Sequence, residues 1–198
     1  MTLNVVEPCA SPLFLNIDEL ATFIAGIQKD SGEIPWSEGG KTDPWDHVES
    51  AMGLTVAGLD EEARRAYEWM ARTQLSDGSW WSALRNGEVE DWTRESNFAA
   101  YLAVGIYHHY LVVQDMAFVR RMWPTIFAGI DFALSMQAPT GEIYWAKNKA
   151  GVVDKTALLT GSSSIFMSLK CALALADRLK EPKDRWQMAL GKLGHAIR

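Results

Sequence analysis

Two groups of acidic residues have the types and spacing that acid–base chemistry needs. Asp46 and Glu49 lie three residues apart at the start of one expected helix, so their carboxylates share a helical face. Asp91 and Glu95 recur at the start of the next helix of the same kind. General acid and base catalysis needs two carboxyl groups that face each other across a substrate, and one from each group would supply them. The sequence does not choose within each group.

A purely structural interpretation of these residues stays open. Asp43 can cap the first helix, and acids in a first turn interact favourably with the helix dipole. In the second group, Arg94 can form a local ion pair with its acidic neighbours. His47 lies on a different face from Asp46 and can orient a loop or relay a proton.

Tryptophan is unusually frequent, with nine residues in 198. A single loop tryptophan normally just packs, but six in equivalent loop positions favour a shared aromatic mouth. The candidate substrate-binding residues are these six tryptophans with His47 and Asn97: Trp36, Trp45, Trp80, Trp81, Trp92 and Trp145.

A repeat explains where these loops come from. Three times an apolar helical run ends in glutamine, a glycine follows four residues later, and aromatic residues close the turn. The glutamines are Gln28, Gln74 and Gln137, and the glycines are Gly32, Gly78 and Gly141. Such recurrence indicates a repeat architecture.

Helical periodicity, caps and turn signals predict seven helices and no strand. Their expected ranges are 16–28, 45–57, 61–74, 93–113, 116–137, 158–179 and 186–198, after an irregular segment 1–16. Long loops alternate with short turns at Gly58, Gln114 and residues 181–183. In antiparallel hairpins every long loop then emerges at one end. We therefore expect Trp36, Trp80 and Trp145 at that end, with Gly58 and Gln114 opposite.

The helices fall into two classes by composition. Those after the long loops are rich in small residues, as at Ala99, Ala103 and Gly105, and suit a close-packed inner ring. Those before the loops alternate apolar and charged residues, as over 61–69, and suit an outer ring.

Composition restricts the possible partners and locations. The net charge is −6 without a basic cluster, so a nucleic-acid partner is not expected. Cys9 and Cys171 sit in no metal-ligand pattern, and we expect neither a metal nor a cofactor. The most apolar stretch, 98–113, is shorter than the about 20 residues of a membrane span. Without an export signal at the N-terminus, the sequence predicts a cytoplasmic protein.

Residues 66–80, with Gln74, Gly78 and Trp80, resemble the QW repeat of squalene cyclases and the related repeats of prenyltransferase β-subunits. The resemblance covers roughly residues 17–198 and implies an all-α fold, an α/α toroid, acting on an isoprenoid substrate. Two features of that family are missing: the acidic D-x-D-D motif, and an evident Asp, Cys and His set for zinc. In the family the repeat residues are structural.

A second toroid group, the six-hairpin glycosidases, is also similar. This weaker resemblance rests on residues 123–137 and 140–145. It implies acidic residues paired with sugar-stacking tryptophans at the N-terminal ends of the inner helices. A third hypothesis is a non-catalytic scaffold whose aromatic mouth binds a glycan, a lipid or a partner.

We therefore expect one α/α-toroid domain over residues 1–198, made of three hairpins and one further helix. Since related toroids close with more helices, this would be the N-terminal part of a larger ring, or a unit that self-associates through its open edges. Its expected ligand is a small molecule, an isoprenoid or a sugar.

Overall fold

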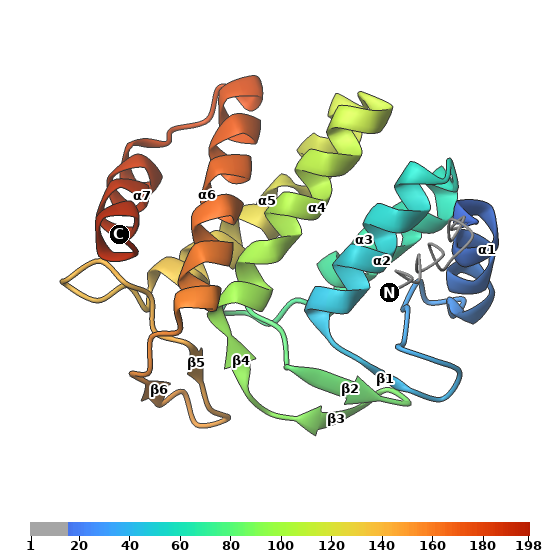
Figure 1. The fold of residues 1–198 in the computed structure, drawn as a ribbon, viewed down its shortest axis with the longest axis horizontal. Helices are drawn as coiled ribbons and strands as arrows, with labels where there is room; N and C mark the ends of the chain where they lie inside the picture. Colours follow the sequence, from blue (N-terminus) through green and yellow to red (C-terminus); the bar gives the residue numbers. More distant parts are fainter. Residues whose placement is uncertain (1–15) are drawn as a thin grey trace, which may run out of the picture.

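The computed structural model describes residues 16–198, so most of the irregular segment expected at 1–16 lies outside the described residues. Within 16–198 the chain forms seven helices, which confirms the all-α prediction (Figure 1). The helices are α1 (Ile17–Ile27), α2 (Pro44–Val56), α3 (Asp60–Thr73), α4 (Ser96–Val113), α5 (Met116–Leu134), α6 (Leu159–Leu179) and α7 (Asp184–Ala196).

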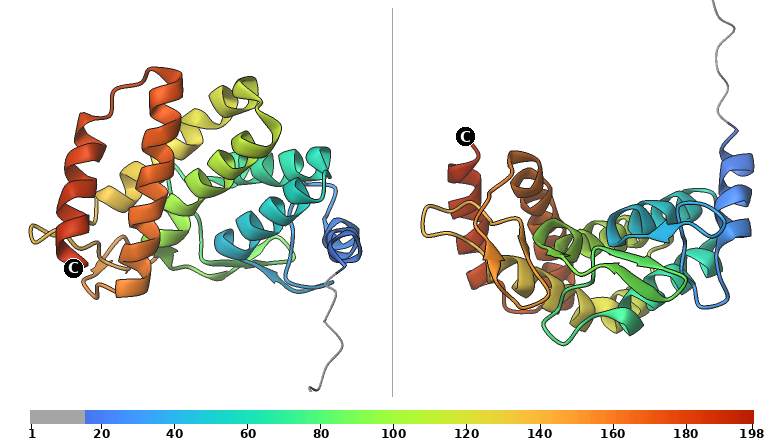
Figure 2. Two further views of the ribbon diagram at one scale, coloured as in Figure 1. Left: turned by 45° about the horizontal axis from the view of Figure 1, so that its top comes forward. Right: turned by 90° about the horizontal axis from the view of Figure 1, so that it is seen from below.

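The helices form an open arc in two layers, as in part of an α/α toroid (Figure 2). The inner layer is α2, α4 and α6, with α4 packed between the other two, and the outer layer is α1, α3, α5 and α7. A Cβ at Gly105 in α4 would lie 2.6 Å from Val48 Cγ1 in α2, so the inner helices do approach closely. The two expected helix classes are thus confirmed.

Long and short connections separate as predicted. The three long loops lie at one end of the arc, and the short turns after α2, α4 and α6 lie at the other (Figure 1). Gln114 adopts a left-handed conformation as the C-cap of α4. The helix α5 continues through Pro124 without a boundary.

The expectation of no strand is wrong, because the long loops pair with one another. The first antiparallel sheet joins β1 (Lys41–Thr42), β2 (Ala83–Arg85) and β3 (Glu88–Asp91), and the second joins β4 (Arg94–Glu95), β5 (Ala146–Lys147) and β6 (Val153–Asp154). These segments satisfy backbone groups across loops distant in sequence, which local periodicity does not reveal. Since β4 takes up Arg94 and Glu95, helix α4 begins at Ser96 rather than at Thr93.

The repeated glutamine joins three parts of the fold. In each copy its side-chain amide donates one hydrogen bond to the glycine carbonyl of its own turn and another to a carbonyl in the next outer helix. The pairs are Gln28 to Gly32 and Glu62 (3.1 and 2.9 Å), Gln74 to Gly78 and Thr125 (3.0 and 2.9 Å), and Gln137 to Gly141 and Ala189 (2.9 and 3.0 Å).

The repeated glycine lets the turn lie directly against that next outer helix. Gly78 has φ of 90°, and a Cβ there would overlap the carbonyl oxygen of Ala128 in α5. Gly32 and Gly141 occupy equivalent positions against α3 and α7. The residue two positions after each glycine is buried in the core, as Trp80 is in the middle copy. Glutamine, glycine and core residue therefore act as one unit that fixes both the loop and the neighbouring hairpin.

One helix, α6, has the length and the apolar composition of a membrane span. Of its apolar window, 44% is buried inside the fold, where α6 packs against α4. A core helix of this kind has the same composition, so the finding is weak support for a membrane location.

We expect Gly78→Ala to lower the free energy of unfolding by more than about 3 kcal/mol, because it adds both positive-φ strain and backbone overlap. Gly87→Ala is the matched control: Gly87 also has positive φ, 83°, but nothing lies within 4 Å of a Cβ there. Backbone strain alone should lower the free energy of unfolding of the Gly87→Ala control by about 1 kcal/mol. Urea unfolding measures both. Equal losses would show that the contact with α5 contributes nothing.

Candidate functional site

A pocket at the loop end brings the two acidic groups together. It has a volume of about 230 Å³ and lies between the first two long loops. Its walls contain Asp46 from α2, Asp91 from β3 and Glu95 from β4, directly before α4. The full lining is Trp36, Lys41, Asp43, Trp45, Asp46, Ser82, Ala83, Asp91, Glu95 and Phe98. Asp46 of the first group and both acids of the second thus reach the same space, as acid–base catalysis would require.

Asp43 holds two neighbours of this pocket in place. As the N-cap of α2, its Oδ1 accepts from the backbone N–H of Asp46 at 3.0 Å, which confirms the capping interpretation for this residue. Its Oδ2 accepts from the indole Nε1 of Trp36 at 2.6 Å. Because Asp43 is buried, these bonds fix the loop bearing Trp36 relative to the first turn of α2.

Asp46 sits where its charged form is disfavoured. Burial is the main cause, and the negative charges of Asp43 and Glu49 add to it, while Lys41 opposes. Together they raise the pKa of Asp46 to about 6. This carboxyl therefore still carries a proton over part of the population near neutral pH, as a general acid must.

Glu95 is held by two donors from different loops. Trp145 Nε1 donates to its Oε2 at 3.0 Å, and Ser82 Oγ donates to its Oε1 at 3.2 Å. Burial raises the pKa of Glu95, and the charges of Asp91 and Asp43 act in the same direction, while the two hydrogen bonds lower it. Asp91 is more exposed, and its Oδ1 accepts from the backbone N–H of Thr93 at 2.8 Å.

A second hollow adjoins this pocket, and we name it the α1 groove. It has a volume of about 480 Å³ and is lined by Phe23, Ile24, Ile27, Ile34, Pro35, Trp36, Asp46, Glu49 and Ser50. Glu49 accepts from the hydroxyl of Tyr101 at 3.1 Å, and Tyr101 stacks on Trp45 with ring centroids 3.6 Å apart. Trp36 and Asp46 line both the α1 groove and the pocket, so the two hollows are neighbours that share these two side chains.

His47 and Trp80 do not reach a ligand, which corrects two expected substrate-binding residues. His47 is fully buried, accepts from the backbone N–H of Ile34 at 3.1 Å and contacts the carbonyl of Ala66 at 2.9 Å. Burial lowers its pKa, so it orients the loop as a neutral ring. Trp80 is 2% exposed and donates to the carbonyl of Met70 at 2.9 Å. Trp80 points inward because it occupies the core position of the repeat, and His47 because its ring lies between the first loop and α3.

The remaining candidates lie at the mouth in other roles. Trp81 and Trp92 pack edge to face 4.9 Å apart, and Lys149 from the third loop lies 3.4 Å above the Trp92 ring. Trp145 supports Glu95 rather than standing free. Asn97 is half-buried in the first turn of α4.

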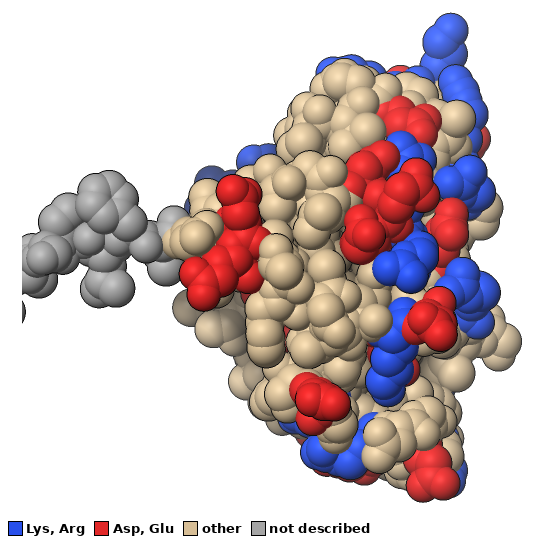
Figure 3. Space-filling view, turned by 90° about the vertical axis from the view of Figure 1, so that its right-hand side faces the viewer, with Lys and Arg blue, Asp and Glu red and all other residues tan. Residues whose placement is uncertain are grey.

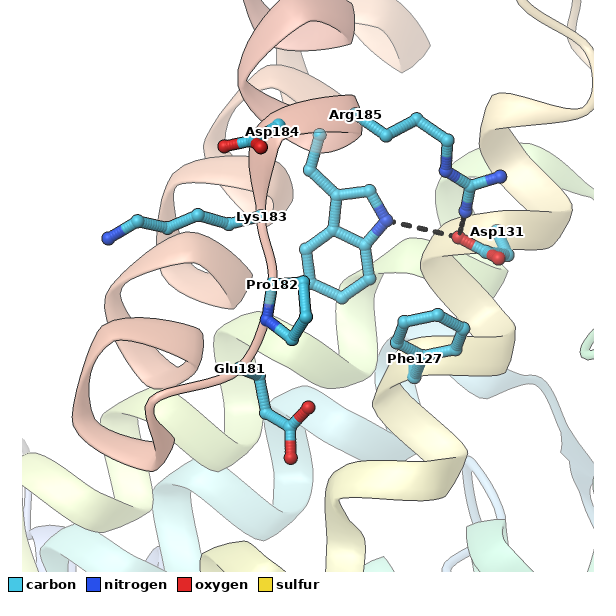
Figure 4. A pocket seen from close by; sticks show the side chains of 8 residues that line it. Phe127, Asp131, Glu181, Pro182, Lys183, Asp184 and Arg185 are labelled. Atoms are coloured by element: carbon cyan, nitrogen blue, oxygen red, sulfur yellow. Dashed lines mark hydrogen bonds and ion pairs between the residues drawn. The ribbon is translucent and has the colours of Figure 1, made fainter.

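A larger hollow lies elsewhere, between α5 and the start of α7 in the outer ring (Figure 4). Its volume is about 570 Å³, and its central carboxylate, Asp131, is tied to Arg185 and to the indole of Trp186. Because Asp131 is engaged in this way and no loop tryptophan lines it, this hollow lacks the arrangement found at the mouth. Across residues 16–198, no group of three metal-binding side chains comes together.

Sequence reasoning did not find Phe23, Lys41, Ser82 or Tyr101. Lys41 and Ser82 reach the site through pairing between loops, which only tertiary structure shows. Tyr101 did carry a signal, since it follows Asn97 by one helical turn on an inner helix. The hairpin β2–β3 carried another, the Asn86-Gly87 turn, whose two positive φ angles of 52° and 83° are those of a type I′ turn.

The chain is similar in sequence to a curated enzyme. No family model matches it. It is 54% identical over 179 residues to the MMP endo-(1,4)-3-O-methyl-alpha-D-mannosidase of Mycolicibacterium hassiacum. The match covers 90% of this chain and 50% of that protein, so the chain spans about half the length of this relative.

Solved structures share the fold at low sequence identity. An alpha-amylase from Clostridium perfringens has a TM-score of 0.65 at 11% identity, covering 90% of this chain and 52% of that one. A glycoside hydrolase family 76 mannosidase from Bacteroides thetaiotaomicron has 0.61 at 10%, covering 83% and 47%. A rhamnosidase from Klebsiella oxytoca has 0.61 at 14%, covering 91% and 38%. The comparisons support the α/α-toroid fold and the resemblance to glycosidases, and they do not support the prenyltransferase resemblance.

We expect Asp46→Asn to stabilise the protein above pH 6 but not below pH 4. With its pKa raised from 3.8 to about 6, native Asp46 keeps a proton that the unfolded chain releases, so stability falls as pH rises through this window. The variant lacks this penalty, which is about 1 kcal/mol or less at a half-exposed site. Thermal melts at pH 4 and pH 7 measure the difference. A variant destabilised more at pH 7 than at pH 4 would instead indicate that the charged carboxylate stabilises the helix.

Proposed function

We propose that this protein is part of a glycoside hydrolase that cleaves α-(1,4) bonds within 3-O-methylated mannose polymers. The observation that carries the proposal is the pocket in which Asp46 meets Asp91 and Glu95 beside Trp36 and Trp45. The reaction class and the substrate follow the 54% identical relative, whose name describes an endo-acting 3-O-methyl-mannosidase.

In this proposal Asp46 is the general acid. A glycosidic oxygen leaves more readily once it is protonated, and the raised pKa of Asp46 keeps a proton available near neutrality. Its position in the first turn of α2, fixed by Asp43, holds the acid at one wall of the pocket. The proton passes from the carboxyl to the departing sugar oxygen, which leaves a carboxylate.

The partner carboxylate comes from the second acidic group. Asp91 is more exposed and has one oxygen free of its bond to Thr93, so it can accept a proton from an attacking water. Glu95 has both oxygens engaged by Trp145 and Ser82, which suits a fixed charge that stabilises positive character on the sugar ring. We therefore assign Asp91 as the base and Glu95 as the electrostatic support.

Trp36 is the stacking platform in this arrangement. Its side chain is 54% exposed and its indole nitrogen is anchored to Asp43, so the ring is held in one orientation. Lys41 Nζ lies over one face, 4.0 Å from the ring centroid, so a sugar would stack on the other face. Trp45 has one face stacked on Tyr101 and adds a second aromatic wall. Aromatic faces of this kind bind the apolar face of a pyranose.

The arc has open edges at α1 and α7, and we propose that further helical hairpins or a second copy cover them in the active protein. A non-catalytic glycan-binding scaffold is the second candidate function. It is favoured by the tryptophan platform itself, which needs no acid to bind a sugar. Hydrolysis distinguishes the two.

We expect Asp46→Asn and Asp91→Asn each to lower kcat by about 10²–10⁴-fold, the usual contribution of a general acid or base. KM should change little, because the tryptophan platform remains. Release of reducing ends from an α-(1,4)-linked, 3-O-methylated mannose oligosaccharide measures the rate.

Glu88→Gln is the control, since Glu88 is exposed on the same strand as Asp91 but does not line the pocket. Hydrolysis unchanged in both variants would contradict the assigned roles. Sugar binding without hydrolysis by the unmodified protein would favour the scaffold.

A further inference from the structure

The α1 groove has two chemically different walls. One wall is apolar and comes from α1 and the first loop, through Phe23, Ile27 and Ile34. The opposite wall comes from α2 and is polar, with Asp46 and Glu49. Figure 3 looks onto the α1 side of the molecule and shows an uncharged band with acidic side chains on one side and mixed acidic and basic side chains on the other.

The groove lies beside the candidate catalytic pocket. Trp36 and Asp46 belong to both linings, so Asp46 borders the two hollows. The volume of the groove, about 480 Å³, lies in the range of small-molecule sites. A second sugar ring next to the reacting bond is therefore the occupant that this adjacency favours.

The apolar wall sets a condition on that ring. A sugar hydroxyl pressed against Phe23 and Ile27 would lose its hydrogen bonds to water without replacement. A methyl ether at the same position has no donor to lose and buries its carbon. The polar wall can still accept hydrogen bonds from the hydroxyls on the other edge of the ring.

We propose that the α1 groove is a subsite for an O-methylated sugar ring, and that Phe23 is a specificity-determining residue that contacts the methyl ether. The inference rests on the proposed function and adds where the methyl group is recognised. Phe23 is 59% exposed, so its side chain lies open to a ligand and is little needed for the core.

Leu20 provides a matched control. It lies one turn earlier on α1 and is 52% exposed, but it does not line the groove. Phe23→Ala and Leu20→Ala therefore both remove an exposed apolar side chain from the same helix. Only the first removes one that the sugar would contact.

The experiment measures calorimetric binding of two α-(1,4)-linked manno-oligosaccharides of equal length, one 3-O-methylated and one unmethylated. The unmodified protein should bind the methylated ligand roughly fourfold more tightly for each buried methyl group. Phe23→Ala should bring this ratio close to one, and Leu20→Ala should leave it unchanged. Hydrolysis of both ligands is measured in parallel.

Four outcomes would overturn the inference. Equal binding of both ligands with hydrolysis intact would remove the methyl subsite and leave the proposed function standing. A preference that survives Phe23→Ala would place methyl recognition elsewhere. A Phe23→Ala variant that melts at lower temperature than Leu20→Ala, with its preference unchanged, would show that protein rather than sugar covers the groove. If neither ligand binds, the inference and the proposed function fall together.

Discussion

The arc depends on a side-chain amide that satisfies two backbone carbonyls at once. Gln74 Nε2 binds the carbonyls of Gly78 and Thr125, which joins the end of α3, the following loop and the next outer helix. Carbonyls near a helix end or in a turn need such partners when water is excluded. Because the same device recurs at Gln28 and Gln137, each hairpin is placed against its neighbour by the same geometry.

The position of the candidate site follows from these glutamine hydrogen bonds. The glutamine hydrogen bonds hold each long loop against the next hairpin, and all three long loops lie at one end of the arc. There the loops pair as short sheets and bring acids from separate hairpins into one pocket. Burial of Asp46, with the negative charges of Asp43 and Glu49 nearby, disfavours its charged form and raises its pKa to about 6. The proposed acid catalysis would use this property, because a carboxyl that resists ionisation can still donate a proton.

The loop tryptophans have different roles, which follow from the partner of each indole N–H. Trp80 and Trp145 direct their indole nitrogens inward, to a backbone carbonyl and to Glu95, and so support the structure of the mouth. Trp36 is anchored by Asp43 while its ring stays exposed. Tryptophan therefore packs in the core, supports an acid or forms a platform. The role depends on the hydrogen-bond partner of its indole N–H and on how much of its ring is exposed.

Sequence alone determined the helices, the alternation of long and short connections and the two acidic groups, because helical periodicity, caps and the Gln and Gly spacing are local signals. It placed the loop tryptophans at one end but did not separate buried Trp80 from exposed Trp36. Only the tertiary structure showed which tryptophan is buried and which is exposed. It alone also showed the loop sheets and the α1 groove. Pairing such as Lys41 with Arg85, and burial such as that of His47, depend on segments far apart in the chain, whose contacts leave no periodic trace in sequence.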